Sequence, residues 1–456
     1  MSIMNNALSG ALASQLALSA SSHNIANLQT KGYTRQSALL TAVGPDAGAR
    51  SAGNGVQVSQ LTRFSDGYKS QQLWRAASDV GSRSQTQPYL TQLERVMGDD
   101  AASLSAGVDK FFGSLNAVAG VDPTSSPLRQ QVLTAAGIMA QRFNGLNNVF
   151  NAQLQSVRQQ RSAIVDSANS AIAGIASLNA QIAQAAVTGK NTSALIDARD
   201  LAIDGLATQM ALDVSDQPDG SRNISLKTGQ ALVIGGLAGA ISASGGAAQT
   251  FSVEFAKSTF GLDAAVIGGQ LGGLSAYEAD ILRPLQQGVS DMAEQLATRV
   301  NAQLAAGYTM DGAPGKPMFV FTAGGGADLL TIAPGFQISD LAFSADNTPG
   351  DSTNLQRLIA LRGQSINVTG LGSVLVGDAD TQLVGKLAVD SQQNRAALST
   401  AETMRNHALE DWQSTSGVNQ DEEAVNLVEY QNMYQANMKV MSVANSLFDA
   451  TLAMMG

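Results

Sequence analysis

Hydrophobic residues at both chain ends recur at the spacing of helices that have one apolar face. In the N-terminal stretch, apolar positions repeat at steps of three and four, and the opposite side carries amide and hydroxyl groups. These positions are Met4, Leu8, Ala11, Leu12 and Leu16. In the C-terminal stretch, two series repeat every seven residues and lie side by side on one face. They are Leu427, Tyr434, Met441, Phe448 and Met455, and Met433, Val440, Leu447 and Met454.

Each terminal stripe needs a partner that covers it. Burying one large apolar side chain is worth about 1.5–3 kcal/mol, so leaving a whole stripe in water is unfavourable. Residues 1–30 contain no Asp, Glu, Lys or Arg, so the N-terminal helix has little to hold it alone in water. We expect the two ends to pack on each other or on neighbouring copies. On the pattern alone, an ordinary core within each stripe's own domain is an equally open alternative.

The longest helical pattern lies in the chain interior. Between Phe143 and Ala185, apolar residues alternate at steps of three and four, and Arg161 is the only charge on the stripe. A helix of about 60 residues would be about 90 Å long, so we expect an elongated molecule. Further helical patterns at 193–212 and 274–307 favour an antiparallel bundle.

Between these helices the spacing changes to that of β-strands. Turn sequences at 218–220 and 228–229 flank short apolar runs at 224–226 and 232–234, and 251–255 is a further strand candidate. We therefore predict a mainly α fold with α+β parts. Its core is expected to be an elongated, discontinuous helical bundle or coiled coil made from N- and C-terminal segments, with small β-rich excursions in the middle.

The same patterns divide the chain into three predicted parts. Residues 1–60 and 405–456 form a terminal helical assembly domain. Residues 61–311 and 350–404 form a long-helix bundle domain with a β-hairpin region at about 213–260. Residues 312–349, which are rich in Gly and Pro around two apolar runs, form a small projecting domain of strands and loops.

Composition excludes most catalytic and metal-binding chemistry. The chain has no Cys, and its only two His residues are His23 and His407, so thiolate chemistry and Cys-based zinc sites are excluded. The acidic run 421–423 follows Asn419, and Glu422 stands three residues after that Asn. This spacing indicates a capping box at a helix start, where acidic residues complement the helix dipole. We predict no catalytic residue, no metal site, no cofactor and no enzyme activity.

Charge and hydropathy argue against two classes of partner. The formal net charge is -10, and no dense Lys/Arg cluster offers a footprint for nucleic acid. Polar residues interrupt every apolar run in residues 1–30, which is unlike a cleaved secretory signal. No stretch of about 18 predominantly apolar residues indicates a membrane span. If the protein is exported, we expect a route without signal cleavage.

A motif after the first predicted helix resembles the N-terminal signature of the flagellar axial proteins, the family of rod, hook and hook-associated subunits. It consists of Ser22-His23-Asn24-Ile25-Ala26-Asn27 and Thr30-Lys31-Gly32-Tyr33-Thr34-Arg35-Gln36. The two Asn side chains can satisfy backbone groups locally, and Gly32 allows a positive φ. The motif is therefore expected to turn the chain from a helix into an extended strand.

Further segments resemble one branch of that family, hook-associated protein 1. They are Gly53-Asn54-Gly55-Val56-Gln57-Val58, Leu178-Asn179-Ala180-Gln181-Ile182-Ala183, Leu195-Ile196-Asp197-Ala198-Arg199-Asp200, and the closing stretch 416–431. The resemblance covers most of residues 1–310 and 385–456. The part between, about 310–385, is short beside family members that carry large outer domains.

This resemblance implies a structural role in bacterial motility. In the family, the paired terminal helices form the inner layer around the export channel, and the bundle forms a second layer. Subunits pass unfolded through the flagellar type III export apparatus, guided by a cytoplasmic chaperone that binds the C-terminal helix. The implied location is the extracellular flagellum. The implied partners are further copies in a ring or helical assembly, the hook protein and hook-associated protein 3, and the assembly is expected to join hook and filament.

The predicted assembly interface combines the two stripes with the signature motif. It comprises Leu8, Leu12, Asn24, Asn27, Gly32, Tyr33, Arg35, Leu427, Tyr434, Met441, Phe448 and Met455. One alternative is another axial subunit, such as the hook protein or hook-associated protein 3, against which segment 195–200 argues. A less favoured alternative is a secreted adhesin or an enzyme that uses residues 310–385.

Overall fold

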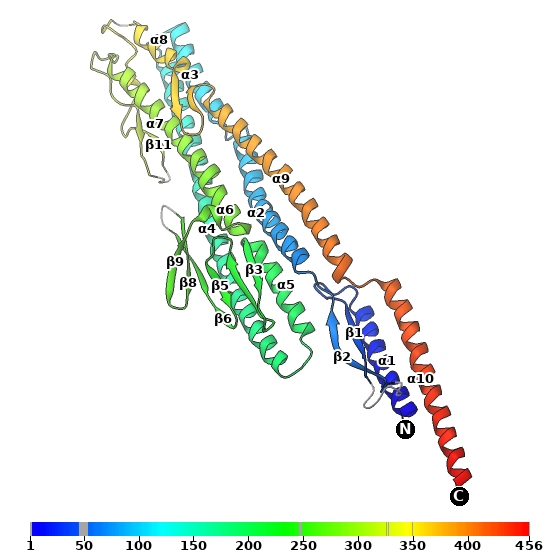
Figure 1. The fold of residues 1–456 in the computed structure, drawn as a ribbon. Coiled ribbons are helices and arrows are strands. Elements are labelled where there is room, and N and C mark those ends of the chain that lie inside the picture. Colours follow the sequence, from blue (N-terminus) through cyan, green and yellow to red (C-terminus); the bar gives the residue numbers. More distant parts are fainter. Residues whose placement is uncertain are drawn as a thin grey trace.

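The computed structural model describes residues 2–44, 53–245, 249–324, 326, 328–348 and 350–455. The molecule is elongated, with a long helical bundle at one end and a smaller terminal unit at the other (Figure 1). Both chain ends lie together at the tip of the terminal unit. The predicted mainly α, elongated fold with small sheets in the middle is confirmed.

One helix forms the spine of the bundle. α4 (Ser126–Val187) is 62 residues long and begins with Pro127 in its first turn, a position that tolerates the missing N–H. Its predicted apolar stripe is buried at Phe143, Phe150 and Ile175, among others. The remaining bundle helices are α2 (Gly67–Met97), α3 (Leu104–Val121), α5 (Ser193–Gln209), α6 (Gly269–Ala276), α7 (Arg283–Ala305), α8 (Thr353–Ala360) and α9 (Ala379–Ser416).

These helices pack as an antiparallel bundle. α4 contacts α3, α5 and α7, and α2 contacts α5, α6 and α9. Local capping fixes where the helices begin: Asp66 Oδ1 accepts the backbone N–H of Tyr68 at 2.8 Å, and Ser103 Oγ accepts that of Ala106 at 3.1 Å. Short 3-10 turns at Ala264–Val266, Ile338–Asp340 and Leu361–Gly363 complete the connections.

A buried ion pair sits where α6 and α7 meet. A π-helical segment, Tyr277–Leu282, joins the two helices. It places Glu278 against Arg161, the one charge on the α4 stripe, and against Arg283. Both Arg161 and Glu278 are nearly inaccessible to solvent. The stripe therefore accommodates a charge because that charge has a buried partner.

Antiparallel sheets lie on one side of the bundle (Figure 1). β3 (Leu212–Asp216), β4 (Arg222–Leu226), β5 (Ala231–Ile234) and β6 (Leu237–Ala238) pair in that order, and β7 (Ala240–Gly245), β8 (Gln249–Phe255) and β9 (Ser258–Leu262) form a second sheet. The predicted strands at 224–226, 232–234 and 251–255 are thus present. The hairpins β10 (Phe319–Phe321) with β11 (Leu330–Ile332), and β12 (Ser365–Val368) with β13 (Gly372–Leu375), lie toward the far end.

The described part of 312–349 packs on the end of the bundle. β11 contacts α4, and β10 contacts α7. Phe319, Leu330 and Phe343 are buried in the same hydrophobic core as the α4 stripe. The division into three domains stays a prediction, and Pro349 and Gly325 lie outside the described residues.

By length and composition alone, α4 is apolar enough for a membrane span, with one window of mean hydropathy 1.2. This differs from the expectation that no stretch would reach that level. The reason is that small and apolar residues fill the helix between its polar positions. Because its buried stripe packs on α3, α5 and α7, we assign α4 to the protein core.

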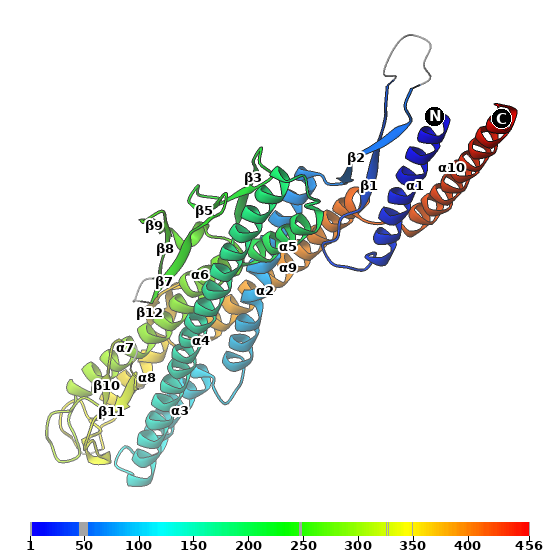
Figure 2. The ribbon, with the colours of Figure 1, turned by 90° about the horizontal axis from the view of Figure 1, so that it is seen from below.

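The terminal unit contains both chain ends. α1 (Ser2–Ala26) lies antiparallel to α10 (Gln420–Met455), and the hairpin of β1 (Gln36–Ala42) and β2 (Val56–Arg63) packs on α1 (Figure 2). The hairpin pairs Gln36 with Arg63 and has a bulge at Leu39/Leu40. Residues 417–419 separate α9 from α10, so the break lies 12 residues beyond the predicted domain boundary at 405.

Candidate functional site

Small residues make the contact between α1 and α10. Ala7, Ala11 and Ala17 of α1 are buried. A Cβ placed on Gly10 would lie 2.6 Å from Asn437 Oδ1 of α10, so a larger residue at this position would require the Asn437 side chain to move. The two helices are therefore held close together without burying a large side chain from α1.

Large apolar residues of α1 remain on the outside of this pair. Leu8, Leu12 and Leu16 are exposed, and 58% of Leu12 is accessible. The residues of the predicted N-terminal stripe therefore do not share one environment. Ala11 is buried in the interior of the unit, whereas the Leu residues face solvent.

On α10, exposure increases toward the C-terminus. Leu427, Tyr434 and Met441 are half-buried on the side that follows α1. Phe448 of the same series is 64% exposed, and Met454 of the neighbouring series is 81% exposed. The side chain of Met455 lies outside the described residues. The structure thus brings part of the C-terminal stripe against α1 and leaves its end uncovered within one copy.

The signature motif forms the corner after α1. Asn24 is buried and holds both sides of the corner: its Nδ2 donates to Gln36 O at 2.8 Å, and its Oδ1 accepts from Gln36 N at 3.1 Å and from Tyr33 Oη at 2.7 Å. Asn27 Nδ2 donates to the carbonyl of His23 at 2.9 Å. Gly32 adopts φ +80°, which favours glycine. The predicted change from helix to strand is confirmed.

Arg35 links this corner to the break between α9 and α10. Its backbone N–H donates to Ser416 O at 2.8 Å, its Nη1 lies 2.5 Å from Glu422 Oε2, and its guanidinium stacks 4.5 Å from the centroid of Phe64. Asn419 caps α10 by accepting the N–H of Asp421 at 3.0 Å. The predicted capping box is therefore formed only in part, because the Glu422 side chain pairs with Arg35.

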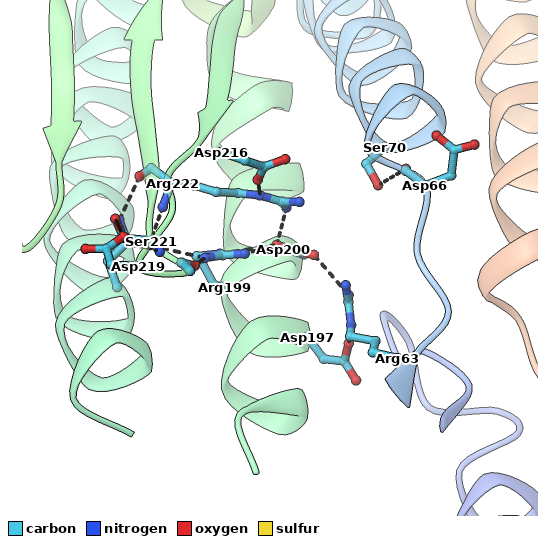
Figure 3. A network of polar contacts seen from close by, with 12 residues as sticks. Arg63, Asp66, Ser70, Asp197, Arg199, Asp200, Asp216, Asp219, Ser221 and Arg222 are labelled. Carbon is cyan, nitrogen blue, oxygen red and sulfur yellow. Dashed lines mark hydrogen bonds and ion pairs between the residues drawn. The ribbon is translucent and has the colours of Figure 1, made fainter. Parts of the chain in front are cut away.

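A charged network joins the hairpin to the bundle (Figure 3). Arg63 at the end of β2 binds two carboxylates of α5, Asp197 at 2.8 Å and Asp200 at 2.9 Å. Asp200 also pairs with Arg199 at 3.3 Å and with Arg222 of β4 at 2.6 Å. One carboxylate therefore ties three arginines from three elements together. Because these side chains are largely buried, the network is expected to fix the hairpin to the bundle firmly.

Burial perturbs ionisation at this joint. Burial, together with the nearby charges of Asp197 and Glu423, raises the pKa of Tyr33 to about 12. Burial lowers the pKa of Arg199, while Asp200 opposes that change. Tyr33 therefore stays protonated and can donate its hydrogen bond to Asn24. The carboxylate of Asp200 stabilises the charged form of the buried Arg199 side chain.

A groove of about 810 Å³ lies beside the joint, between the signature corner and the ends of α2, α5 and α9. Both tryptophans of the chain line it: Trp74 is buried and Trp412 is partly buried. Leu28 and Leu201 add exposed apolar surface. This groove therefore lies where the terminal unit meets the bundle.

The described residues contain no group of three or more His, Asp or Glu side chains that could hold a metal ion. His23 is exposed and lies 2.8 Å from Asn27 through its Nδ1 atom, and His407 is exposed beside Glu410. The contacts described at this site hold the chain ends and the joint in place.

Sequence reasoning did not assign roles to Arg63, Asp197, Asp200 and Arg222. They lie in three different elements, β2, α5 and β4, and meet only in the folded chain. The one available signal was the sequence Asp197-Ala198-Arg199-Asp200 on a predicted helix, which places several charges close to one another.

Comparisons with known proteins agree with this architecture. Residues 90–319 match the model of the flagellar hook-associated protein FlgK helical domain. Residues 412–454 match the flagellar basal body rod FlgEFG protein C-terminal model. The first match covers α3 to α7 of the bundle, and the second covers nearly all of α10.

Relatives that match over nearly their full length belong to the same group of flagellar proteins. The chain is 26% identical to flagellar hook-associated protein 1 of Salmonella typhimurium over 560 aligned positions, covering 99% of each chain. It is 24% identical to the protein of that name from Bacillus subtilis, covering 97% of this chain and 96% of the relative. The structure of the flagellar hook junction protein FlgK from Burkholderia pseudomallei superposes with a TM-score of 0.67 at 17% identity, covering 75% of this chain and all of that one. The chain belongs to the family of the flagellar hook-associated protein FlgK.

Proposed function

We propose that this chain is a structural subunit of the junction between hook and filament of the bacterial flagellum, and that its copies assemble through the paired terminal helices. The observation that supports this proposal most strongly is the structure of the terminal unit. It buries small residues between α1 and α10 and leaves Leu8, Leu12 and Phe448 in water. Large apolar side chains on an exposed, charge-poor surface are typical of protein interfaces.

Eleven of the twelve predicted interface residues fall into three roles in this proposal, and the side chain of the twelfth, Met455, lies outside the described residues. Leu8, Leu12 and Phe448 contact neighbouring copies, while Leu427, Tyr434 and Met441 hold α10 against α1. The signature residues Asn24, Asn27, Gly32, Tyr33 and Arg35 set the angle between the terminal unit and the bundle. Their hydrogen bonds across the corner support this assignment, since a stacked subunit needs a fixed angle between its inner and outer parts.

The family comparison favours hook-associated protein 1 over the two alternatives, hook protein and hook-associated protein 3. We propose that the assembled zone contacts the hook protein on one side and hook-associated protein 3 on the other. The adhesin alternative loses support because Phe319 and Leu330 of the 312–349 segment are buried in the bundle core.

We also propose export to the flagellum without signal cleavage, with a cytoplasmic chaperone covering α10 before export. Residues 2–26 form α1 and pack on α10, so they belong to the folded unit. The exposed apolar side chains of α10 would need cover in the cytoplasm. No catalytic role is proposed.

Deletion of the gene, followed by electron microscopy and assay of the medium, tests the function. We expect hooks of normal length without filaments, and filament subunits released into the medium. Complementation with the wild-type gene should restore filaments. Loss of the hooks would indicate a hook or rod subunit instead, and normally attached filaments would contradict the proposal.

A further inference from the structure

The end of α10 extends past the end of α1. Because the two helices are antiparallel and Gly10 lies against Asn437, each step back along α1 matches one step forward along α10. With equal rise per residue, Ser2 lies level with residue ~445, which leaves roughly ten residues of α10 beyond its partner. Figure 1 shows this projection at the C-terminus. We call residues 446–455 the overhang.

The overhang has one broad apolar face. Leu447, Phe448, Leu452 and Met454 are all exposed, and Asp449 is its one charged residue. Helical positions 447, 448, 452 and 454 span an arc of roughly 160°, which is wider than a narrow coiled-coil stripe. A face this broad suits a concave groove better than contact along a single line.

A groove of suitable character lies at the opposite end of the same terminal unit. The groove beside the joint has a volume of about 810 Å³. Its walls combine apolar residues, among them Leu28, Leu201, Leu409 and Trp412, with charged ones, which are Lys31, Arg35, Asp200, Asp204, Arg405 and Glu422. Among the described residues, neither Lys31 nor Asp449 has an ion-pair partner.

We propose that the overhang of one copy inserts into the groove beside the joint of the next copy, with Asp449 near Lys31. The occupant must come from another copy, since about 28 residues of helix separate Gln420 from Phe448, a distance of about 42 Å. Such head-to-tail contacts join two different surfaces, so they propagate in one direction and build an open polymer or a ring. This inference rests on the proposed junction function and names the surfaces that its subunits use.

This contact would place successive terminal units at a regular spacing along the polymer. The groove is lined by Leu28, just after α1, and by Asn419, just before α10, so it lies at the end of the α1–α10 pair opposite to the overhang. One inserted end therefore places the next unit along the same direction. The groove is also lined by Tyr33, Arg35 and Glu422, which hold the angle between terminal unit and bundle. An inserted neighbour would therefore contact the joint directly and hold that angle.

Photo-crosslinking tests the contact in the full-length chain. Phe448 is replaced by the photoreactive residue p-benzoylphenylalanine, which keeps the aromatic ring, and flagella isolated from cells that express this variant are irradiated. We expect crosslinked peptides from residues 28–33, 201 or 405–413. Every such crosslink is intermolecular, because a chain cannot reach its own groove. The same photoreactive residue at Phe260, exposed on β9, should give at least fivefold fewer of these peptides.

The outcomes separate this inference from the proposed function. If junctions form but the crosslinks fall only on α1, α10 or another protein, the overhang contact is wrong and the junction function stands. If the wild-type chain is absent from isolated junctions, both are wrong. As a second test, the charge reversals Asp449→Lys and Lys31→Asp should each lower the crosslink yield about two- to fivefold, as expected for one exposed ion pair. The double reversal should restore the yield, and failure to restore it would contradict the placement of Asp449 near Lys31.

Discussion

The bundle and the terminal unit use hydrophobic residues in opposite ways. In the bundle, the spine helix α4 buries large side chains, and Phe150 is 0% exposed. In the terminal unit, α1 and α10 meet through Ala and Gly, and Phe448 is 64% exposed. The bundle therefore has a complete core within one chain, whereas the terminal unit reaches a comparable core only when other copies cover it.

The difference assigns folding and assembly to separate parts of the molecule. A bundle with its own core keeps its shape in the free subunit. We expect a terminal unit that buries few large apolar side chains to open at low free energy cost and to become ordered on assembly. The joint between them, formed by Asn24, Arg35, Arg63 and Asp200, connects the stable part to the assembling part.

The sharpest contrast comes from truncating a phenylalanine in each region. Phe150→Ala leaves a cavity in the bundle core and is expected to lower the free energy of unfolding by about 3–5 kcal/mol. Phe448→Ala removes an exposed side chain and should change that free energy by less than about 0.5 kcal/mol. Denaturant unfolding measures both. Filament attachment should fail for Phe448→Ala, although the soluble chain stays folded. Equal destabilisation by the two variants would contradict the contrast.

The buried ion pair tests whether the charge on the α4 stripe depends on its partner. Glu278→Gln leaves Arg161 buried without a carboxylate, and we expect a loss of about 3 kcal/mol in the free energy of unfolding. The double variant Arg161→Met/Glu278→Leu replaces the pair by apolar side chains and should unfold within about 1.5 kcal/mol of wild type. A double variant as unstable as Glu278→Gln would show that the pair itself stabilises the bundle.

Removing the shared carboxylate should loosen the joint. Asp200→Asn weakens the bonds to three arginines and should cost about 1.5–3 kcal/mol, as expected for charge-assisted hydrogen bonds. Hydrogen exchange should become faster in β1 and β2 and stay unchanged in α4. Asp109→Asn is the matched control, because its ion pair with Arg362 is exposed and worth at most about 1 kcal/mol. Unchanged exchange in the hairpin would contradict the role of Asp200.

Alkaline pH should produce the smallest effect, confined to the same joint. The pKa of Tyr33 is raised to about 12 by burial, whereas an unfolded Tyr titrates near pH ~10. The stabilisation by neutral Tyr33 is therefore complete below pH ~10 and is lost between pH ~10 and ~12. Fluorescence of Trp412, recorded in a Trp74→Phe background, should report the loosening. Tyr33→Phe should lack this step, and a step that persists in Tyr33→Phe would show that another group causes it.

The repeating elements could be predicted from the sequence, because periodicity depends only on local spacing. The 62-residue helix α4, the strands β4, β5 and β8, and the corner at Gly32 follow from patterns that neighbouring residues carry by themselves. The sequence left the pairing of the two chain ends as one of several alternatives, and in the structure the ends pair while Leu8 and Leu12 of the predicted α1 stripe stay exposed.

The contacts across the joint could not be predicted in the same way. Arg63 lies 134 residues from Asp197, and Arg35 lies 387 residues from Glu422. Such pairs depend on how the elements pack, and no spacing rule connects them. The same limit applies to α1, where the pattern gave one apolar face and packing divided it into buried Ala11 and exposed Leu12.

Hydrogen exchange on the dilute monomer and on isolated flagella tests the central claim most directly, because it reads the terminal unit and the bundle in one measurement. We predict that amides of α1 and α10 exchange much faster than those of α4 in the monomer, and that they become as protected as α4 in the assembled junction. Equal protection of α10 and α4 in the dilute monomer would show that the chain ends need no neighbouring copy, and would contradict the account.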